Sequence, residues 1–147
     1  MAYMHQILPR LFVGSDVAAT DVPTLKRFKI QAILNVDGPV LSYAVPKNIV
    51  FLHYYIPDGQ IIPPPTLDLV LKFIETQIKA GRNTLVHCAM GISRSPSLCI
   101  AYMMFIYPKM SWDQALREVS RIRAISPAPE IKESIIDYFD AKRNPPK

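Results

Sequence analysis

Cysteine is scarce in this sequence: Cys88 and Cys99 are the only two among 147 residues. Two cysteines cannot form a disulfide framework, and together with the three histidines they do not show the spacing of a zinc site. No apolar run is long enough to cross a bilayer, and the opening residues lack the basic and then apolar segments of a secretory signal. We therefore expect a cytoplasmic protein that uses no metal, no other cofactor and no membrane partner.

Long blocks of one charge are also missing. Lys and Arg number 17 and Asp and Glu 12, which gives a net charge of +5 that favours anionic partners. The basic residues are spread along the chain, whereas a nucleic-acid interface needs a clustered basic footprint. We therefore do not expect nucleic acid as a partner, and the sequence says nothing about the oligomeric state.

The length of 147 residues fits one domain, 1–147, with 141–147 as a frayed tail. Short apolar segments rich in Val, Ile, Phe and Tyr alternate with helical patterns. The segments expected to be strands are 10–14, 31–37, 48–57 and 83–88. The sequence thus predicts an α/β fold: a central, mixed and mostly parallel sheet of four to five strands with helices on both faces.

Capping signals locate most of the expected helices. Asp21 and Thr66 are candidate N-caps, and Ser111 with Gln114 forms a capping box. A further helix is expected over 95–107, and Pro129 introduces the last one. The side chains expected to be buried by the last two helices are Trp112, Leu116, Val119, Ile122, Ile131, Ile135, Tyr138 and Phe139.

The stretch "NTLVHCAMGISRSPSLC", residues 83–99, is typical of a strand, a tight loop and a helix. Such a loop presents backbone N–H groups and the positive end of the helix dipole, which together bind an oxyanion. Gly91 supplies the turn and Arg94 a planar fork of donors that matches two phosphate oxygens. The remaining loop positions have side chains with little chemistry, so their amides are the expected contribution: Ala89, Met90, Ile92 and Ser93.

Cys88 begins this loop, where the amides, the dipole and Arg94 all favour a thiolate. A thiolate there could attack a bound phosphoryl group and form a phosphocysteine, and Ser95 could then help the sulfur to leave. The alternative is that Cys88 is a small buried hydrophobe, as free cysteines usually are. For Cys99, in the middle of the expected helix, that alternative is the better interpretation.

The segment "VHCAMGISRS" resembles the HCxxGxxRS signature of the cysteine-dependent protein tyrosine phosphatase superfamily, and specifically its dual-specificity phosphatase family. The segments "ILPRLFVGS", "AILNVD" and "FLHYYIPD" resemble other parts of that catalytic domain in order and spacing. The resemblance implies Cys88 as nucleophile, Arg94 as phosphate clamp, Ser95 as the hydroxyl that assists thiolate departure, and His87 as a group that tunes Cys88.

A general acid must protonate the leaving oxygen, and Asp58 is the preferred candidate. It follows an expected strand on a loop bracketed by Pro57 and Gly59, and it matches the family's acid position. Asp37 ends another strand and is the rival, with a turn in "DGP" as its more ordinary role. Ala128 stands where relatives often carry an asparagine that braces the loop, which leaves the loop's rigidity open.

The expected function is hydrolysis of phosphotyrosine and phosphoserine or phosphothreonine in proteins through a cysteinyl-phosphate. The alternatives are a phosphoinositide or RNA 5'-triphosphate substrate, a phosphate-binding module without turnover, and sulfur transfer. The lack of basic residues at the variable loop positions counts against a phosphoinositide, and the presence of both Cys88 and Arg94 counts against a silent module. Arg121 and Arg123 are candidates for contact with an acidic substrate, or simply a solvated helix face.

Overall fold

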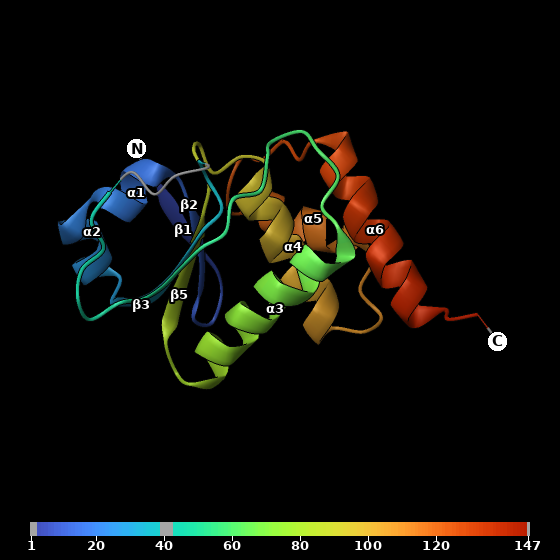
Figure 1. The fold of residues 1–147 in the computed structure, drawn as a ribbon, viewed down its shortest axis with the longest axis horizontal. Coiled ribbons are helices and arrows are strands. Elements are labelled where there is room, and N and C mark those ends of the chain that lie inside the picture. The colour runs from blue at the N-terminus through green and yellow to red at the C-terminus, as the bar shows by residue number, and fades with distance from the viewer. Residues whose placement is uncertain (1–2, 39–42, 147) are drawn as a thin grey trace.

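A five-stranded mixed sheet runs through the molecule, in a computed structural model that describes residues 3–38 and 43–146. Its order is β1-β2-β5-β3-β4; β1 pairs antiparallel with β2, and the other neighbours are parallel. The predicted α/β fold with a mostly parallel sheet is confirmed (Figure 1). The strands are β1 (Met4–Leu8), β2 (Leu11–Gly14), β3 (Ile30–Asn35), β4 (Val50–His53) and β5 (Asn83–His87).

Helices cover both faces of this sheet (Figure 1). Successive β5 residues show the division: Leu85 packs in the cluster of α1 and α2, and Val86 in that of the other four helices, because alternate side chains of a strand point to opposite faces. The helices are α1 (Asp16–Thr20), α2 (Val22–Arg27), α3 (Pro64–Lys79), α4 (Arg94–Ile106), α5 (Trp112–Ser120) and α6 (Pro129–Arg143). In the described residues no helix has the length and apolar character needed to span a bilayer.

Two elements at the start of the chain were not predicted. β1 lies at the sheet's edge, and its polar His5 and Gln6 stay partly or fully exposed, which hides the strand in the sequence pattern. Helix α1 has only five residues and begins after Ser15, whose hydroxyl accepts from the N–H of Ala18. It is too short to show a helical period.

Helix α3 begins earlier than the sequence indicated. Its N-cap is Pro63, and Thr66 is buried inside the first turn, so the assignment of Thr66 as the cap is wrong. Prolines fit a first turn because its N–H groups have no intrahelical partner. Strand β4 is shorter than 48–57, although Tyr54 N still donates to the carbonyl of Asn35, the last residue of β3, and Ile56 N to that of Val36, the residue after it.

The C-terminal part differs from prediction in two details. Ile122 lies past the end of α5 and is 41% exposed rather than buried. Residues 141–143, assigned to a frayed tail, are helical, because the Arg143 guanidinium donates to backbone carbonyls at the end of α4 and beyond it. Residue 147 lies outside the described residues.

The capping box at the start of α5 is confirmed. The Ser111 hydroxyl accepts from Gln114 N at 3.1 Å, and the Gln114 side chain accepts from Ser111 N at 2.9 Å. Two N–H groups that the helix itself cannot satisfy are thereby paired.

We predict that Ser111→Ala lowers the free energy of unfolding by about 1 kcal/mol and the Tm by roughly 2–4 °C. Denaturant titration and a thermal melt measure both. Ser120→Ala, in the last residue of α5, is the matched control and should change neither; equal losses in the two variants would show that the cap contributes nothing special.

Candidate active site

The carboxyl ends of the parallel strands and the N-terminus of α4 enclose a hollow of about 320 Å³. Strand β5 runs toward this hollow from the lower end of the molecule in Figure 1, and the loop 88–93 then leads into α4. The hollow contains most of the residues that the sequence singled out: Cys88, Ala89, Met90, Ile92, Ser93, Arg94, Asp58 and Ala128, with Gly59 and Ser126. Gly91 is the loop residue missing from this lining.

The backbone carbonyl groups of the loop are held by donors from other parts of the protein. Every residue from 89 to 93 has its backbone oxygen in a hydrogen bond to a donor beyond the loop. The donors are Asp16 N to Ala89 O (3.0 Å), Arg123 Nη2 to Met90 O (3.1 Å), Arg123 Nε to Gly91 O (2.8 Å), Ser126 N to Ile92 O (2.6 Å) and Ser97 N to Ser93 O (3.0 Å). The surrounding protein therefore fixes which way each peptide unit faces.

The backbone N–H groups of the same loop are available to a ligand. Within residues 3–38 and 43–146, no backbone N–H from residue 89 to residue 94 has a protein acceptor. Successive amides in a turn before a helix form a concave site for an anion, and the dipole of α4 adds to it. This arrangement fits the predicted oxyanion cup, and the four side chains of residues 89–93 bring no charge to it.

Gly91 is the position where this loop comes closest to its supports. Its φ is +71°, and a Cβ there would lie 2.6 Å from Arg123 Nη2 and 2.7 Å from the backbone of Gly14. Both the left-handed conformation and the lack of space require glycine.

Cys88 and Ser95 face each other at the base of the cup. Cys88 Sγ lies 3.2 Å from Ser95 Oγ and 3.5 Å from Ser95 N. The hydroxyl has one proton, which either this sulfur or Gly14 O, at 3.3 Å, can accept. Both side chains are buried. Cys88 belongs to the apolar core cluster, but its sulfur also lies within reach of the two donors of Ser95.

The environment of Cys99 differs from that of Cys88. It is fully buried within α4, and burial raises the pKa of its thiol. Its surroundings are those of a core residue, as the sequence indicated.

The described residues contain no group of His, Cys, Asp and Glu side chains arranged to hold a metal ion.

Arg94 connects the loop to the ends of β3 and β4. Its Nη1 donates to Ile56 O at 3.0 Å and Val36 O at 3.4 Å, and its Nη2 donates to Asp37 Oδ1 at 2.9 Å. The Arg94 side chain is 9% exposed and that of Asp37 28%, so this ion pair is largely shielded from solvent. The Nε–H and one Nη2–H remain for a ligand, and two such parallel donors match two oxygens of a phosphate.

The two candidate acids have different environments. Asp58 lines the same hollow as Cys88, is 63% exposed, and lies 4.0 Å from Arg94 Nε. Asp37 lines a separate hollow on the other side of His87 and holds Arg94 through its carboxylate. The sequence predicted a turn role for Asp37 and did not predict its ion pair with Arg94. Pro39, the last residue of that expected turn, lies outside the described residues.

His87 contacts the nucleophile only through the backbone. Its Nδ1 lies 3.2 Å from Cys88 O, and its Nε2 lies 2.8 Å from the Tyr43 hydroxyl, which the sequence gave no reason to select. Because a carbonyl only accepts, Nδ1 carries the proton and Tyr43 donates to Nε2. Burial lowers the pKa of His87 to about 4, so the ring is neutral near pH 7.

Arg123 supports the loop instead of reaching outward. Besides its bonds to Met90 and Gly91, its Nη1 lies 3.0 Å from His5 Nδ1. The interpretation of Arg123 as part of a solvated helix face is wrong, because it lies beyond α5 and its guanidinium is bound to the loop. Arg121 lies in an exposed ion pair with Glu118.

The loop is also braced where Ala128 replaces an asparagine. Ala128 N donates to Ser93 Oγ at 3.0 Å, so Ser93, expected to offer only its amide, contributes its side chain as well. Together with the Ser126 bond to Ile92, this contact ties the loop to the segment before α6.

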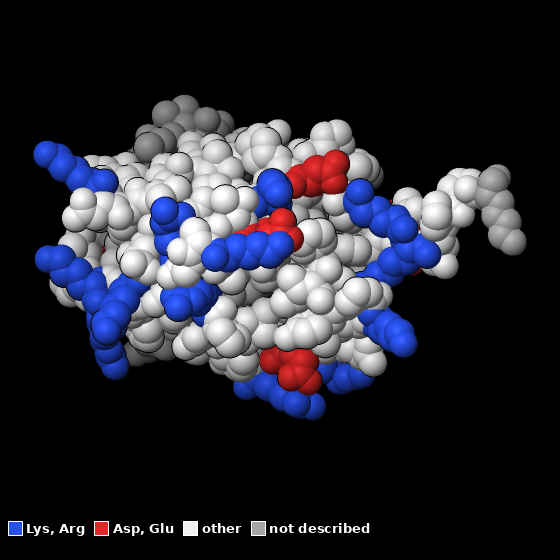
Figure 2. Space-filling view, turned by 90° about the horizontal axis from the view of Figure 1, so that it is seen from below, with Lys and Arg blue, Asp and Glu red and all other residues white. Residues whose placement is uncertain are grey.

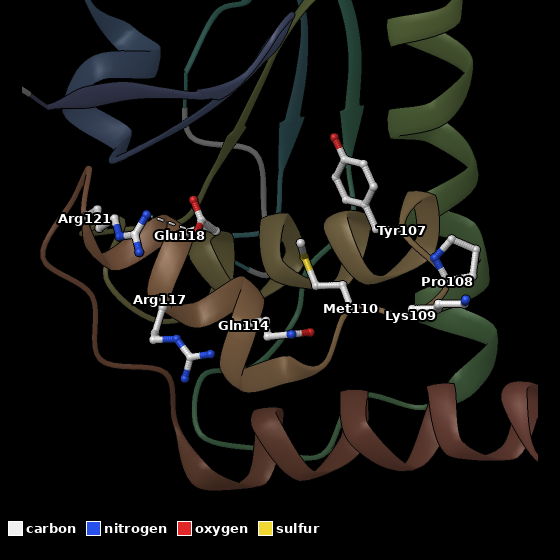
Figure 3. Close-up of a pocket in the computed structure, with 8 residues that line it drawn as sticks. All are labelled: Tyr107, Pro108, Lys109, Met110, Gln114, Arg117, Glu118 and Arg121. Carbon is white, nitrogen blue, oxygen red and sulfur yellow. Dashed lines mark ion pairs between the residues drawn. The ribbon is translucent and has the colours of Figure 1, made fainter.

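A hollow larger than the one around Cys88 lies elsewhere, beside the end of α4 and along α5 (Figure 3). It measures about 690 Å³ and is lined by Tyr107, Pro108, Lys109, Met110, Gln114, Arg117, Glu118 and Arg121. It shares no residue with the hollow around Cys88, so it is not the candidate for the site that the sequence predicted.

Comparison with known proteins agrees with the site geometry. Residues 11–141 match the family model described as the dual specificity phosphatase catalytic domain. The chain belongs to this family. Tyrosine-protein phosphatase vhp-1 of Caenorhabditis elegans is 32% identical over 93% of the chain and 23% of that protein. Dual specificity protein phosphatase 15 of Mus musculus is 29% identical over 92% of the chain and 57% of that protein.

Solved structures of this family superpose closely. Human DUSP28 has a TM-score of 0.85 at 25% identity, with 97% of each chain covered. The human tyrosine phosphatase-like serine/threonine/tyrosine-interacting protein has a TM-score of 0.84 at 26% identity, with 92% of this chain and 94% of that chain covered. The chain spans less than a quarter of vhp-1 and little more than half of phosphatase 15.

We predict that Gly91→Ala lowers kcat/KM for a small aryl phosphate by about 100-fold or more, because the loop must shift to admit the methyl group. Gly81→Ala is the matched control: its φ is also positive, +83°, but nothing lies within 4 Å of its added Cβ. It should lose stability only. Steady-state kinetics at equal folded fractions decides; equal kinetic losses in both variants would contradict the packing argument.

Proposed function

We propose that this chain hydrolyses phosphotyrosine and phosphoserine or phosphothreonine in proteins through a cysteinyl-phosphate intermediate. The observation that carries the proposal is the orientation of the loop: its carbonyls are bound outside and its amides are left for an oxyanion directly above Cys88. Family membership supports the same reaction. The substrates belong to this proposal, since the chain matches only part of its relatives.

In the first step, the thiolate of Cys88 attacks phosphorus while the loop amides and Arg94 hold the other phosphate oxygens. The bond between phosphorus and the leaving oxygen breaks, and Asp58 gives that oxygen its proton. Asp58 is suited to this role because it lines the hollow with Cys88 and its carboxylate makes no close ion pair. Asp37 is unsuited because its carboxylate is bound to Arg94.

In the second step, water attacks the phosphocysteine and Asp58 takes a proton from it. The bond between sulfur and phosphorus breaks, and Ser95 donates its hydroxyl proton in a hydrogen bond to the departing Cys88 sulfur, 3.2 Å away. Inorganic phosphate leaves and the thiolate is restored. His87 acts in both steps as a positioning residue that holds the Cys88 carbonyl in place.

The same geometry bears on the alternative functions. One structural relative is described as a phosphatase-like interacting protein. In this chain, the presence of both Cys88 and Arg94 at the hollow supports turnover over binding alone. A substrate with several phosphates would need more cations around the cup, and among the hollow's lining residues only Arg94 is basic. We place the activity in the cytoplasm, where a reducing environment keeps Cys88 free.

We predict that Cys88→Ser lowers turnover of p-nitrophenyl phosphate by roughly 1,000-fold or more, because the hydroxyl is a poor nucleophile at neutral pH. Affinity for a phosphotyrosine peptide, measured by calorimetry, should change little since the amides and Arg94 remain. Cys99→Ala is the control and should retain turnover. A Cys88→Ser variant that loses peptide binding as well would refute the division between anion binding and attack.

We predict that Asp58→Ala lowers kcat/KM, which reports the first step alone, about 100-fold for phenyl phosphate and far less for dinitrophenyl phosphate, whose leaving oxygen needs no proton. Asp37→Asn, which disturbs Arg94 instead, should slow both substrates alike. Rates measured over a series of aryl phosphates test this. If Asp58→Ala slows every ester equally, another group is the acid.

A further inference from the structure

A basic residue precedes each of the parallel strands. Arg10 comes directly before β2, Lys29 before β3 and Arg82 before β5, and Lys47 lies three residues ahead of β4. Parallel strands all begin at the same edge of a sheet. The fold therefore gathers cations that are far apart in the sequence, at the edge opposite the phosphate loop.

The end of α2 adds two more cations to this edge, since it leads into β3 within three residues. The basic edge consists of Arg10, Lys26, Arg27, Lys29, Lys47 and Arg82. All are exposed except Arg82, which is half-buried, and within residues 3–38 and 43–146 none of them forms an ion pair. Viewed from below, the left half of the molecule shows blue side chains with almost no red among them (Figure 2).

A hollow of about 330 Å³ opens within the basic edge. Its floor is apolar and includes the buried Leu25 and Ile30, and three lysines stand around it: Lys26, Lys29 and Lys47. Val22, which is 44% exposed, adds apolar surface. No acidic residue lines the hollow, so it combines a positive rim with an apolar interior.

We propose that the basic edge is a docking surface for an acidic segment of a partner protein that also carries apolar side chains. Carboxylates of the segment would lie against the lysine rim and an apolar side chain would enter the hollow. An acidic segment with a leucine-sized side chain satisfies the lysine rim and the apolar interior together, and RNA and anionic vesicles, which also match the rim, are arms of the test below. The surface lies at the opposite edge from Cys88, so a docked partner leaves the phosphate site open.

This proposal does not depend on the chemistry at Cys88. The docking surface shares no residue with the hollow around the phosphate loop. Binding can therefore be measured on the full chain without turnover, and a failure of one proposal leaves the other standing.

The test uses a short fluorescein-labelled peptide of glutamates interspersed with leucines, followed by fluorescence anisotropy. In Lys26→Glu/Lys47→Glu the affinity should fall by about tenfold or more, because two favourable charge contacts become repulsive. Lys26→Gln/Lys47→Gln should fall by less, and Lys109→Glu/Lys132→Glu, an equal charge change at two exposed lysines off this edge, should stay within about twofold. Turnover of p-nitrophenyl phosphate should be the same in all four proteins, which shows that they are folded.

Two comparisons separate other ligands from the proposed one. A glutamate peptide without leucines should bind more weakly, and single-stranded RNA or phosphatidylserine vesicles should bind no more tightly than the leucine-containing peptide. Equal losses in the on-edge and off-edge charge variants would overturn the proposal. Tighter binding of RNA or vesicles that is lost in Lys26→Glu/Lys47→Glu would also overturn it.

Discussion

The outward hydrogen bonding of the loop carbonyls is the constraint on which this site depends. A loop with no basic side chain before Arg94 can hold a phosphate only through its amides, and amides face inward only if the opposite ends of the peptide units are held outward. Donors from α1, from Arg123, from Ser126 and from the first turn of α4 hold them. The loop's shape is therefore a property of the whole fold.

The rest of the site follows from that constraint. Close support at Gly91 leaves no room for a side chain. The free amides line the hollow that also contains Cys88, which is where we propose that the phosphate binds. Arg94 is then positioned from a third direction, by Asp37 and two strand-end carbonyls, so that its free N–H groups complete the cup. Preorganised donors of this kind stabilise charge without rearrangement during the reaction, which is where such sites gain most of their rate.

The sequence was most informative where structure is local. The order of strand, loop and helix around Cys88, the capping box at Ser111 and the mostly parallel sheet could all be predicted from neighbouring residues. Contacts across the fold could not: Arg123 reaches Gly91 over 32 residues and Arg94 reaches Asp37 over 57. The basic edge was missed for the same reason, because its cations gather only when the strands align in parallel.

A crystal structure of the chain with bound tungstate, a tetrahedral oxyanion, tests the central claim most directly. The account predicts that tungstate oxygens accept hydrogen bonds from the N–H groups of residues 89–94 and from the Arg94 guanidinium, with Cys88 Sγ facing the metal atom of the anion. The carbonyl bonds to Asp16, Arg123 and Ser126 should be unchanged. Tungstate held by side-chain cations elsewhere, or loop carbonyls turned into the hollow, would contradict it.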